Sequence, residues 1–371
     1  MKRSLQFILF FGVLTFFLYI GNFVIYDALS VIFHIFDSSQ LLFLASMLGI
    51  FSGSLVASTI IGNKYYNWFT RFYYTLSAVW IGFFVYMFLA SFAYGVIMII
   101  SGQLFVEIGA VLIFMALVIS IYGIIHAKKI YVMEIKISLP QLPDVWRGRK
   151  AVWISDLHLG QLHGSSFVKK IVEKVNKLSP DIIFIGGDLF DGTTSPDLIT
   201  LIAPLKKLSG SLGVYFITGN HEEFGNSDKF ISAVKTIGIN ILQDRMVEID
   251  GIQLIGVDYH NASDKNRFKK ILSELRINTH KPSILLKHEP KDLNVALEAG
   301  ISLQISGHTH QAQLWPLRYV ANLIYKNFTY GLKTLGEMKI YTSSGVGTWG
   351  PPMRVGTNNE IVLFTFIQST P

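Results

Sequence analysis

The chain has 371 residues, a formal net charge of +7 and no cysteine, so it is long enough for two domains and cannot form disulfides or cysteine-ligated zinc sites. Charged side chains are unevenly distributed, since residues 1–127 carry only seven of the 57 Asp, Glu, Lys and Arg residues. The remainder has a surplus of six basic charges, which is too mild for a protein specialised in binding nucleic acid, and no nucleic-acid partner is expected.

Four stretches without charged residues, apart from their flanks, fill the first third of the chain: residues 4–26, 38–63, 72–106 (interrupted at 101–103) and 108–127. Each is long enough to cross a hydrocarbon core of ~30 Å, which needs ~20 helical residues. A cleavable signal peptide would account for only the first stretch. Glu107 lies near a predicted helix end and is interpreted as an interfacial carboxylate. We therefore expect a four-helix transmembrane anchor over residues 1–127 and the lipid bilayer as a partner.

The basic residues of this region predict its orientation. They occur before the first predicted helix, between the second and third, and after the fourth, at Lys2, Arg3, Lys64, Arg71, Lys128 and Lys129. The other two connections, around residues 27–40 and 101–103, contain no Lys or Arg. Because basic loops are retained on the cytoplasmic side, we expect a multi-pass protein of the cell membrane with both termini and the soluble domain in the cytoplasm.

After the anchor, residues 128–145 are predicted to form a juxtamembrane linker and first strand, and residues 146–371 a soluble domain. Short β-rich runs alternate there with helical segments, which is typical of an α/β domain. The predicted strands are residues 131–137, 150–155, 182–185, 214–218, 253–257, 283–286, 303–305, 340–343 and 361–366. The predicted helices are residues 167–178, 197–208, 229–237, 267–275 and 293–299.

Polar clusters follow five of the predicted strands directly. They are Asp156 with His158, Asp188 with Asp191, Asn220 with His221, His288, and His308 with His310. One such cluster is more often a cap or a turn than a ligand set, but five in one chain are poorly explained by structure alone. Ligands bind at the carboxyl ends of strands in α/β sheets, so these groups are expected to converge there.

The order D-x-H, G-D-x-x-D, G-N-H-E, H and G-H-x-H resembles the calcineurin-like metallophosphoesterase family over roughly residues 145–366. By this resemblance the fold would be two packed mixed β-sheets flanked by helices. It implies that Asp156, His158 and His310 hold one divalent metal ion, that Asn220, His288 and His308 hold another, and that Asp188 bridges them. Carboxylate and imidazole ligands suit Mn²⁺, which we favour, as well as Fe, Zn, Co or Ni.

The family chemistry would be hydrolysis of a phosphate ester or pyrophosphate bond, with hydroxide generated between the metals attacking phosphorus. His221 would act as general acid at the leaving oxygen, and Asp191 would accept a hydrogen bond from it. The alternative for Asp191 is a carboxylate that only forms a turn. Glu222, Glu289 and Asp258 are interpreted as capping or supporting residues.

Two departures from the family pattern indicate which branch of the family the chain resembles. Gly192 stands where protein phosphatases have a phosphate-binding arginine, and Gln311, Ala312 and Gln313 replace the G-G-Q that often follows G-H-T-H. The chain looks more like membrane-associated bacterial members, whose substrates include UDP-2,3-diacylglucosamine. A lipid-associated or nucleotide-lipid phosphate is therefore the expected substrate. The alternatives are a cyclic-nucleotide or nucleic-acid phosphodiesterase, a non-catalytic membrane sensing module, and a transporter that the soluble domain regulates.

Residues 314–328 are rich in Trp, Tyr, Leu and Ile and include Arg318 and Lys326. One interpretation is an interfacial element that inserts apolar side chains into lipid near the site. The other is a helix or hairpin buried in the soluble core, and the sequence does not decide between them.

Overall fold

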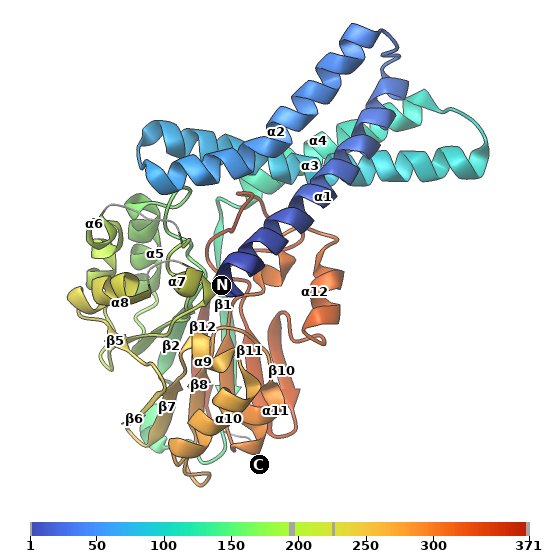
Figure 1. Ribbon diagram of the computed structural model, residues 1–371. Coiled ribbons are helices and arrows are strands. Elements are labelled where there is room, and N and C mark those ends of the chain that lie inside the picture. Colours follow the sequence, from blue (N-terminus) through green and yellow to red (C-terminus); the bar gives the residue numbers. More distant parts are fainter. Residues whose placement is uncertain (1, 193–196, 225–226, 369–371) are drawn as a thin grey trace. The chain divides into compact units, whose positions relative to one another are not determined.

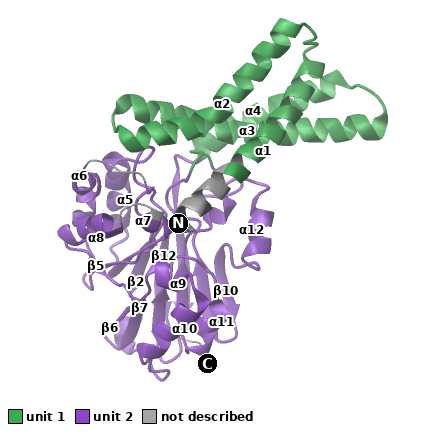
Figure 2. Ribbon diagram, in the orientation of Figure 1, with its two compact units in different colours: residues 1–126, 350–353 green, residues 127–349, 354–371 purple. Residues whose placement is uncertain are grey.

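The computed structural model describes residues 2–192, 197–224 and 227–368, without the side chains of residues 2–11, 14 and 224. The chain separates into two compact units, Met1–His126 with Gly350–Met353 and Ala127–Trp349 with Arg354–Pro371 (Figure 2). The side chains of Lys2 and Arg3, which contribute to the predicted orientation, lie outside the described residues.

Four long apolar helices make up most of the first unit: α1 (Lys2–Ile32), α2 (Ser38–Lys64), α3 (Trp68–Ser101) and α4 (Val106–His126). By length and composition, each contains a segment able to cross a membrane. The predicted first span ends at residue 26, but α1 continues through Asp27 to Ile32. The chain turns only beyond this point, where His34 has a φ of 52° and the Asp37 carboxylate caps α2.

Two six-stranded mixed sheets form the centre of the second unit (Figure 1). The first sheet has the order β1 (Ile130–Ser138), β12 (Asn359–Ile367), β2 (Lys150–Ile154), β3 (Ile182–Ile185), β4 (Val214–Phe216), β5 (Asn240–Ile241). The second has the order β10 (Gly331–Leu335), β11 (Met338–Thr342), β9 (Leu303–Ser306), β8 (Ser283–Leu286), β7 (Ile252–Gly256), β6 (Arg245–Ile249). Strands β2 to β5 are parallel to one another, and so are β7, β8, β9 and β11.

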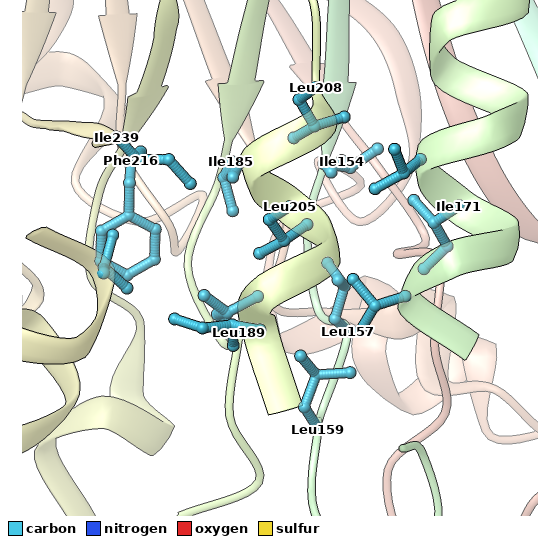
Figure 3. Packing of buried hydrophobic residues seen from close by; sticks show 14 of the residues in the cluster. Ile154, Leu157, Leu159, Ile171, Ile185, Leu189, Leu205, Leu208, Phe216 and Ile239 are labelled. Atoms are coloured by element: carbon cyan, nitrogen blue, oxygen red, sulfur yellow. The ribbon is translucent and has the colours of Figure 1, made fainter. Parts of the chain in front are cut away.

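The alternation of side chains along the strands builds separate cores on the two faces of the sheets. In β2, Trp153 packs between the two sheets, together with Phe184 and Phe364. Its neighbour Ile154 points to the opposite face and packs under helices (Figure 3). These helices are α5 (Ser165–Lys177), α6 (Leu198–Ile202), the 3-10 helix Ala203–Lys207 and α8 (Ser227–Thr236).

The outer face of the second sheet is covered by α10 (Lys265–Glu274) and α11 (Leu293–Glu298). The remaining helices are short: α7 (Asn220–Phe224), α9 (Tyr259–Ala262), α12 (Arg318–Ile324) and the 3-10 helices Asp144–Trp146 and His310–Ala312. The architecture is therefore helix, sheet, sheet, helix, which confirms the predicted fold class.

Three strands were not predicted, and all of them lie at sheet edges. β5 ends the first sheet, while β10 and β6 end the second. β5 has two residues, and β6 and β10 show no alternation of buried and exposed residues, so the two-residue hydrophobic period is absent. The predicted helix 197–208 is instead α6 followed by a 3-10 helix, since Pro204 interrupts the α-helical hydrogen bonds.

Candidate metal centre

Segments that follow the carboxyl ends of five strands bring the predicted site residues together. β2 leads to Asp156 and His158, β3 to Asp188 and Asp191, β4 to Asn220 and His221, β8 to His288, and β9 to His308 and His310. Three of these strands belong to the first sheet and two to the second. The site is therefore assembled by both sheets, and the predicted convergence is observed.

The first group contains Asp156, His158 and His310. Nε2 of His158 lies 2.9 Å from Nε2 of His310, and Nε2 of His310 lies 3.7 Å from Asp156 Oδ1. All three side chains are buried. Two imidazole nitrogens that face each other this closely beside a carboxylate offer three ligand atoms to one cation.

The second group contains Asp188, His288 and His308, with Asn220 beside them. Nε2 of His288 lies 3.2 Å from Asp188 Oδ2, and Nδ1 of His308 lies 2.8 Å from Asn220 Oδ1. The main-chain oxygen of Gly186 lies 2.7 Å from Nδ1 of His288. It therefore accepts the proton on Nδ1, which directs Nε2 towards the carboxylates.

Asp188 lies between the two groups. Its Oδ2 is 3.2 Å from Nε2 of His288 and 3.9 Å from Nε2 of His158. Asp188 is only 2% exposed, and a buried carboxylate needs compensating positive charge or hydrogen bonds. The donor set, with nitrogen and oxygen ligands on both sides of one buried carboxylate, fits divalent cations.

The backbone is strained where these side chains are held. Five of the seven predicted ligands have positive φ: Asp156 (57°), His158 (48°), Asp188 (50°), His308 (69°) and His310 (47°). For residues other than glycine this conformation costs on the order of 1–3 kcal/mol and persists only where surrounding contacts impose it. Such strain is concentrated at functional sites in proteins.

Glu222 supplies several of these contacts. Its buried carboxylate accepts hydrogen bonds from the N–H groups of Asp188 (3.0 Å), Phe190 (3.1 Å) and Gly219 (2.7 Å). At Gly219 a Cβ atom would stand 2.2 Å from Asp188 Oδ1, so the loop approaches the carboxylate too closely for any side chain. The interpretation of Glu222 as a supporting residue agrees with this geometry.

Opposing charges control ionisation in the site. Burial raises the pKa of Asp156 to about 6, although His288 opposes the shift. Burial acts on Asp188 in the same direction, but His288 and His221 hold its pKa well below the usual value. The pKa of His288 is raised to about 10, because Asp188 and Asp156 outweigh the effect of burial.

His221 lies beside both groups. Its ring is 4.6 Å from the ring of His158, and the main-chain N–H of His221 donates to Asp188 Oδ1 at 2.8 Å. Nδ1 of His221 lies 2.9 Å from the main-chain oxygen of Asp191, while the carboxylate of Asp191 accepts from the N–H of Gln161 at 3.0 Å. A main-chain oxygen of Asp191 thus contacts the histidine, and the carboxylate also stabilises a turn.

Two features were missed from the sequence. Arg354 is fully buried, and its guanidinium donates to the main-chain oxygens of His310, Ser344 and Gly347 and to Asn359 Oδ1, each at 2.7 Å. A signal existed, since a Ser-Gly-Val-Gly run at residues 344–347, which holds two of the main-chain oxygens that Arg354 contacts, follows predicted strand 340–343.

The second feature is Trp349, which the loop at residues 311–313 holds beside the site. Gln311, Ala312 and Gln313 have φ values of 52°, 54° and 58°, so the chain keeps a left-handed conformation without the glycines that usually permit it. The Gln313 side chain bonds to the main-chain N–H (3.1 Å) and oxygen (3.2 Å) of Trp349, whose ring lies 5.9 Å from that of His221. The loop at residues 311–313 therefore positions Trp349 next to His221.

Comparisons with known proteins identify the family of this chain. A family model described as calcineurin-like phosphoesterase matches residues 149–312. An uncharacterized metallophosphoesterase of Campylobacter jejuni is 33% identical over 234 residues, which cover 62% of each chain. A transmembrane protein with metallophosphoesterase domain from Danio rerio is 33% identical over 68% of this chain and 61% of its own length. An uncharacterized metallophosphoesterase of Aquifex aeolicus is 31% identical over 68% of this chain and 97% of its own length.

Proposed function

Since the chain belongs to the calcineurin-like phosphoesterase family, we propose that it hydrolyses a phosphate ester or pyrophosphate bond in a lipid-associated substrate with two divalent metal ions. The coarser description, a membrane protein with a metal-dependent phosphoester hydrolase domain, follows from the family, the four apolar helices and the clustered ligands. The number of metals, their identity and the substrate are the parts that we add.

The position of Asp188 carries the proposal of two metals. Its Oδ2 lies within 4 Å of ligand nitrogens in both groups, so one carboxylate would bridge two ions. Asp156, His158 and His310 would hold one ion, and Asn220, His288 and His308 the other. Three oxygen-bearing ligands among the seven favour Mn²⁺ over softer metals. Bound ions would make water more acidic and neutralise charge on the phosphate oxygens.

His221 is proposed to protonate the leaving oxygen. With Asp191 O accepting the proton on Nδ1, the tautomer and ring orientation are fixed, and Nε2 would act towards the substrate. Since Asp191 supplies its main-chain oxygen, replacing its carboxylate should alter this orientation less than replacing the histidine alters turnover.

The lipid-associated substrate is supported by the membrane anchor. Only residues 127–129 separate α4 from β1, so the phosphoesterase domain is tethered within a few residues of a membrane-crossing helix. Tethering raises the effective concentration of any substrate held in the same membrane. The distribution of Lys and Arg supports a cytoplasmic domain. Protease added to intact cells should then leave the domain uncut.

The test uses the full-length protein in detergent, stripped of metal and reloaded with Mn²⁺. The substrates are bis(p-nitrophenyl) phosphate, p-nitrophenyl phosphate and UDP-2,3-diacylglucosamine. His221→Ala should retain metal and lose turnover by roughly 10²–10⁴-fold, the usual contribution of a general acid. The matched control is His280→Ala, an exposed histidine before the amino end of β8.

Metal-dependent release from the lipid nucleotide alone would support a lipid pyrophosphatase. Cleavage of the simple diester alone would keep the hydrolase and refute this substrate. An unaffected His221 variant would remove the acid role, and no turnover under any metal would refute the proposal.

A further inference from the structure

Helix α12 exposes its apolar side. Leu323 is 83% exposed and Ile324 is 66% exposed, whereas Ala321 is only 9% exposed. A helix on the surface of a water-soluble domain normally directs polar residues outward and apolar ones inward. This pattern speaks against a helix buried in the soluble core, although Leu314 and Ala321 within residues 314–328 are buried.

The exposed hydrophobic side chains of α12 and of the residues just before it are what we call the α12 face. Six large exposed hydrophobic residues fall within ten positions of the chain: Trp315, Leu317, Tyr319, Val320, Leu323 and Ile324. Single exposed hydrophobic residues are ordinary, but a run of this density marks an interaction surface.

The α12 face adjoins the metal centre. Tyr325, which follows the last residue of α12, donates its hydroxyl proton to Glu289 Oε1 at 3.2 Å. The same carboxylate oxygen lies 3.9 Å from Nε2 of His308, and the rings of Tyr325 and His308 are 6.2 Å apart. Two side chains, Tyr325 and Glu289, therefore connect the end of α12 to the predicted metal ligand His308.

We propose that the α12 face docks on a lipid surface. The chain is anchored by four membrane helices, and the connection to the phosphoesterase domain is three residues long, so lipid is always close. The face has the composition of a membrane interface, with Trp and Tyr beside Leu, Val and Ile. Arg318 lies within this run and the exposed Lys326 follows it, and both suit anionic headgroups.

Docking does not depend on which reaction the site catalyses, so it can be tested independently of the proposed hydrolysis. Its consequence is positional, because the face and His308 are joined through Tyr325 and Glu289. A docked α12 face would hold the metal centre next to the headgroup layer.

The absence of cysteine allows a direct test on the full chain. Leu323→Cys places one thiol on the α12 face, and Ser273→Cys places one on the exposed surface of α10 as the matched control. Each variant is labelled with an environment-sensitive fluorophore and reconstituted in nanodiscs, where both membrane surfaces are accessible. Quenching by spin-labelled lipid and by aqueous iodide is then measured.

The label of Leu323→Cys should be quenched severalfold more by spin-labelled lipid than that of Ser273→Cys, and severalfold less by iodide. Equal responses at the two positions would overturn the proposal. Protection from iodide without quenching by lipid would also overturn it, because protein, such as a second copy of the chain, would then cover the face.

The headgroup contribution is tested in the same assay. Lipid quenching should be stronger in nanodiscs of phosphatidylcholine with phosphatidylglycerol than in phosphatidylcholine alone. Arg318→Gln combined with Lys326→Gln should abolish this difference without changing the value in phosphatidylcholine. A difference that survives both substitutions would overturn the assignment of these two residues to anionic headgroups.

Discussion

Replacing Arg354 by Met should destabilise the phosphoesterase domain and loosen the metal centre together. The guanidinium makes four hydrogen bonds of 2.7 Å and has no exposed surface. Bonds to charged groups contribute ~1.5–3 kcal/mol each, and relief from burying the charge offsets part of their sum. We therefore expect a loss of about 3–5 kcal/mol, the range seen when buried charged networks are broken.

The measurement is thermal unfolding of the full chain in detergent, combined with metal content by mass spectrometry. A loss of this size corresponds to a fall of roughly 6–20 °C in Tm, at about 2–4 °C per kcal/mol for a domain of this class. Metal content should fall because Arg354 holds the main chain of His310. Arg354→Lys should rescue little, since the three donors of an ammonium sit on one atom and cannot reach the four acceptors that the planar guanidinium spans.

The matched control is Arg147→Met. Arg147 is half-exposed and pairs with Asp144 at the surface, so its loss should change stability by less than about 0.5 kcal/mol. If Arg354→Met unfolds at the temperature of the control and binds the same amount of metal, the buried network does not support the site.

Three further outcomes are expected. Asp188→Asn should lower metal occupancy and activity in parallel, as measured on the same preparation, and normal occupancy would remove its bridging role. Glu222→Gln should cost ~1–3 kcal/mol, because its amide sets a donor against one of the three N–H groups that the carboxylate accepts; an unchanged Tm would contradict this. Metal affinity should rise with pH, because His288 has a pKa of about 10 and must lose a proton before it can bind the ion. Below about pH 6 Asp156 is also protonated, since its pKa is about 6, so binding must then displace a second proton. Calorimetric titration with Mn²⁺ should show a slope of about tenfold per pH unit for one proton, steeper below about pH 6, and a flat profile would refute the assignment of His288 as a ligand.

The sequence predicted the α/β domain and the site loops well, because buried parallel strands are strongly hydrophobic and end in polar clusters. It did not predict β5, β6 and β10, because β5 has only two residues and β6 and β10 do not alternate buried and exposed positions. The end of α1 was missed because Asp27 resembles a loop residue but lies within the helix.

Within the site, residue types predicted which side chains converge but not how they are held. Asp191 illustrates this, because the residue contacts His221 through its main-chain oxygen, which every residue type possesses. Arg354 lies more than 40 positions from His310 and reaches it only through tertiary structure. The exposure of the α12 face likewise depends on packing, since the same apolar run suits a buried helix equally well.

The place of β12 in the first sheet has a consequence for biogenesis. This strand, near the C-terminus, lies between β1 and β2 and is the partner that β1 has among the described strands. During translation the membrane helices and β1 leave the ribosome first, and β1 must wait for the synthesis of every other strand before it is paired. Insertion into the membrane therefore precedes completion of the phosphoesterase fold, and a chain that stops before Asn359 would be an anchored protein with an open sheet.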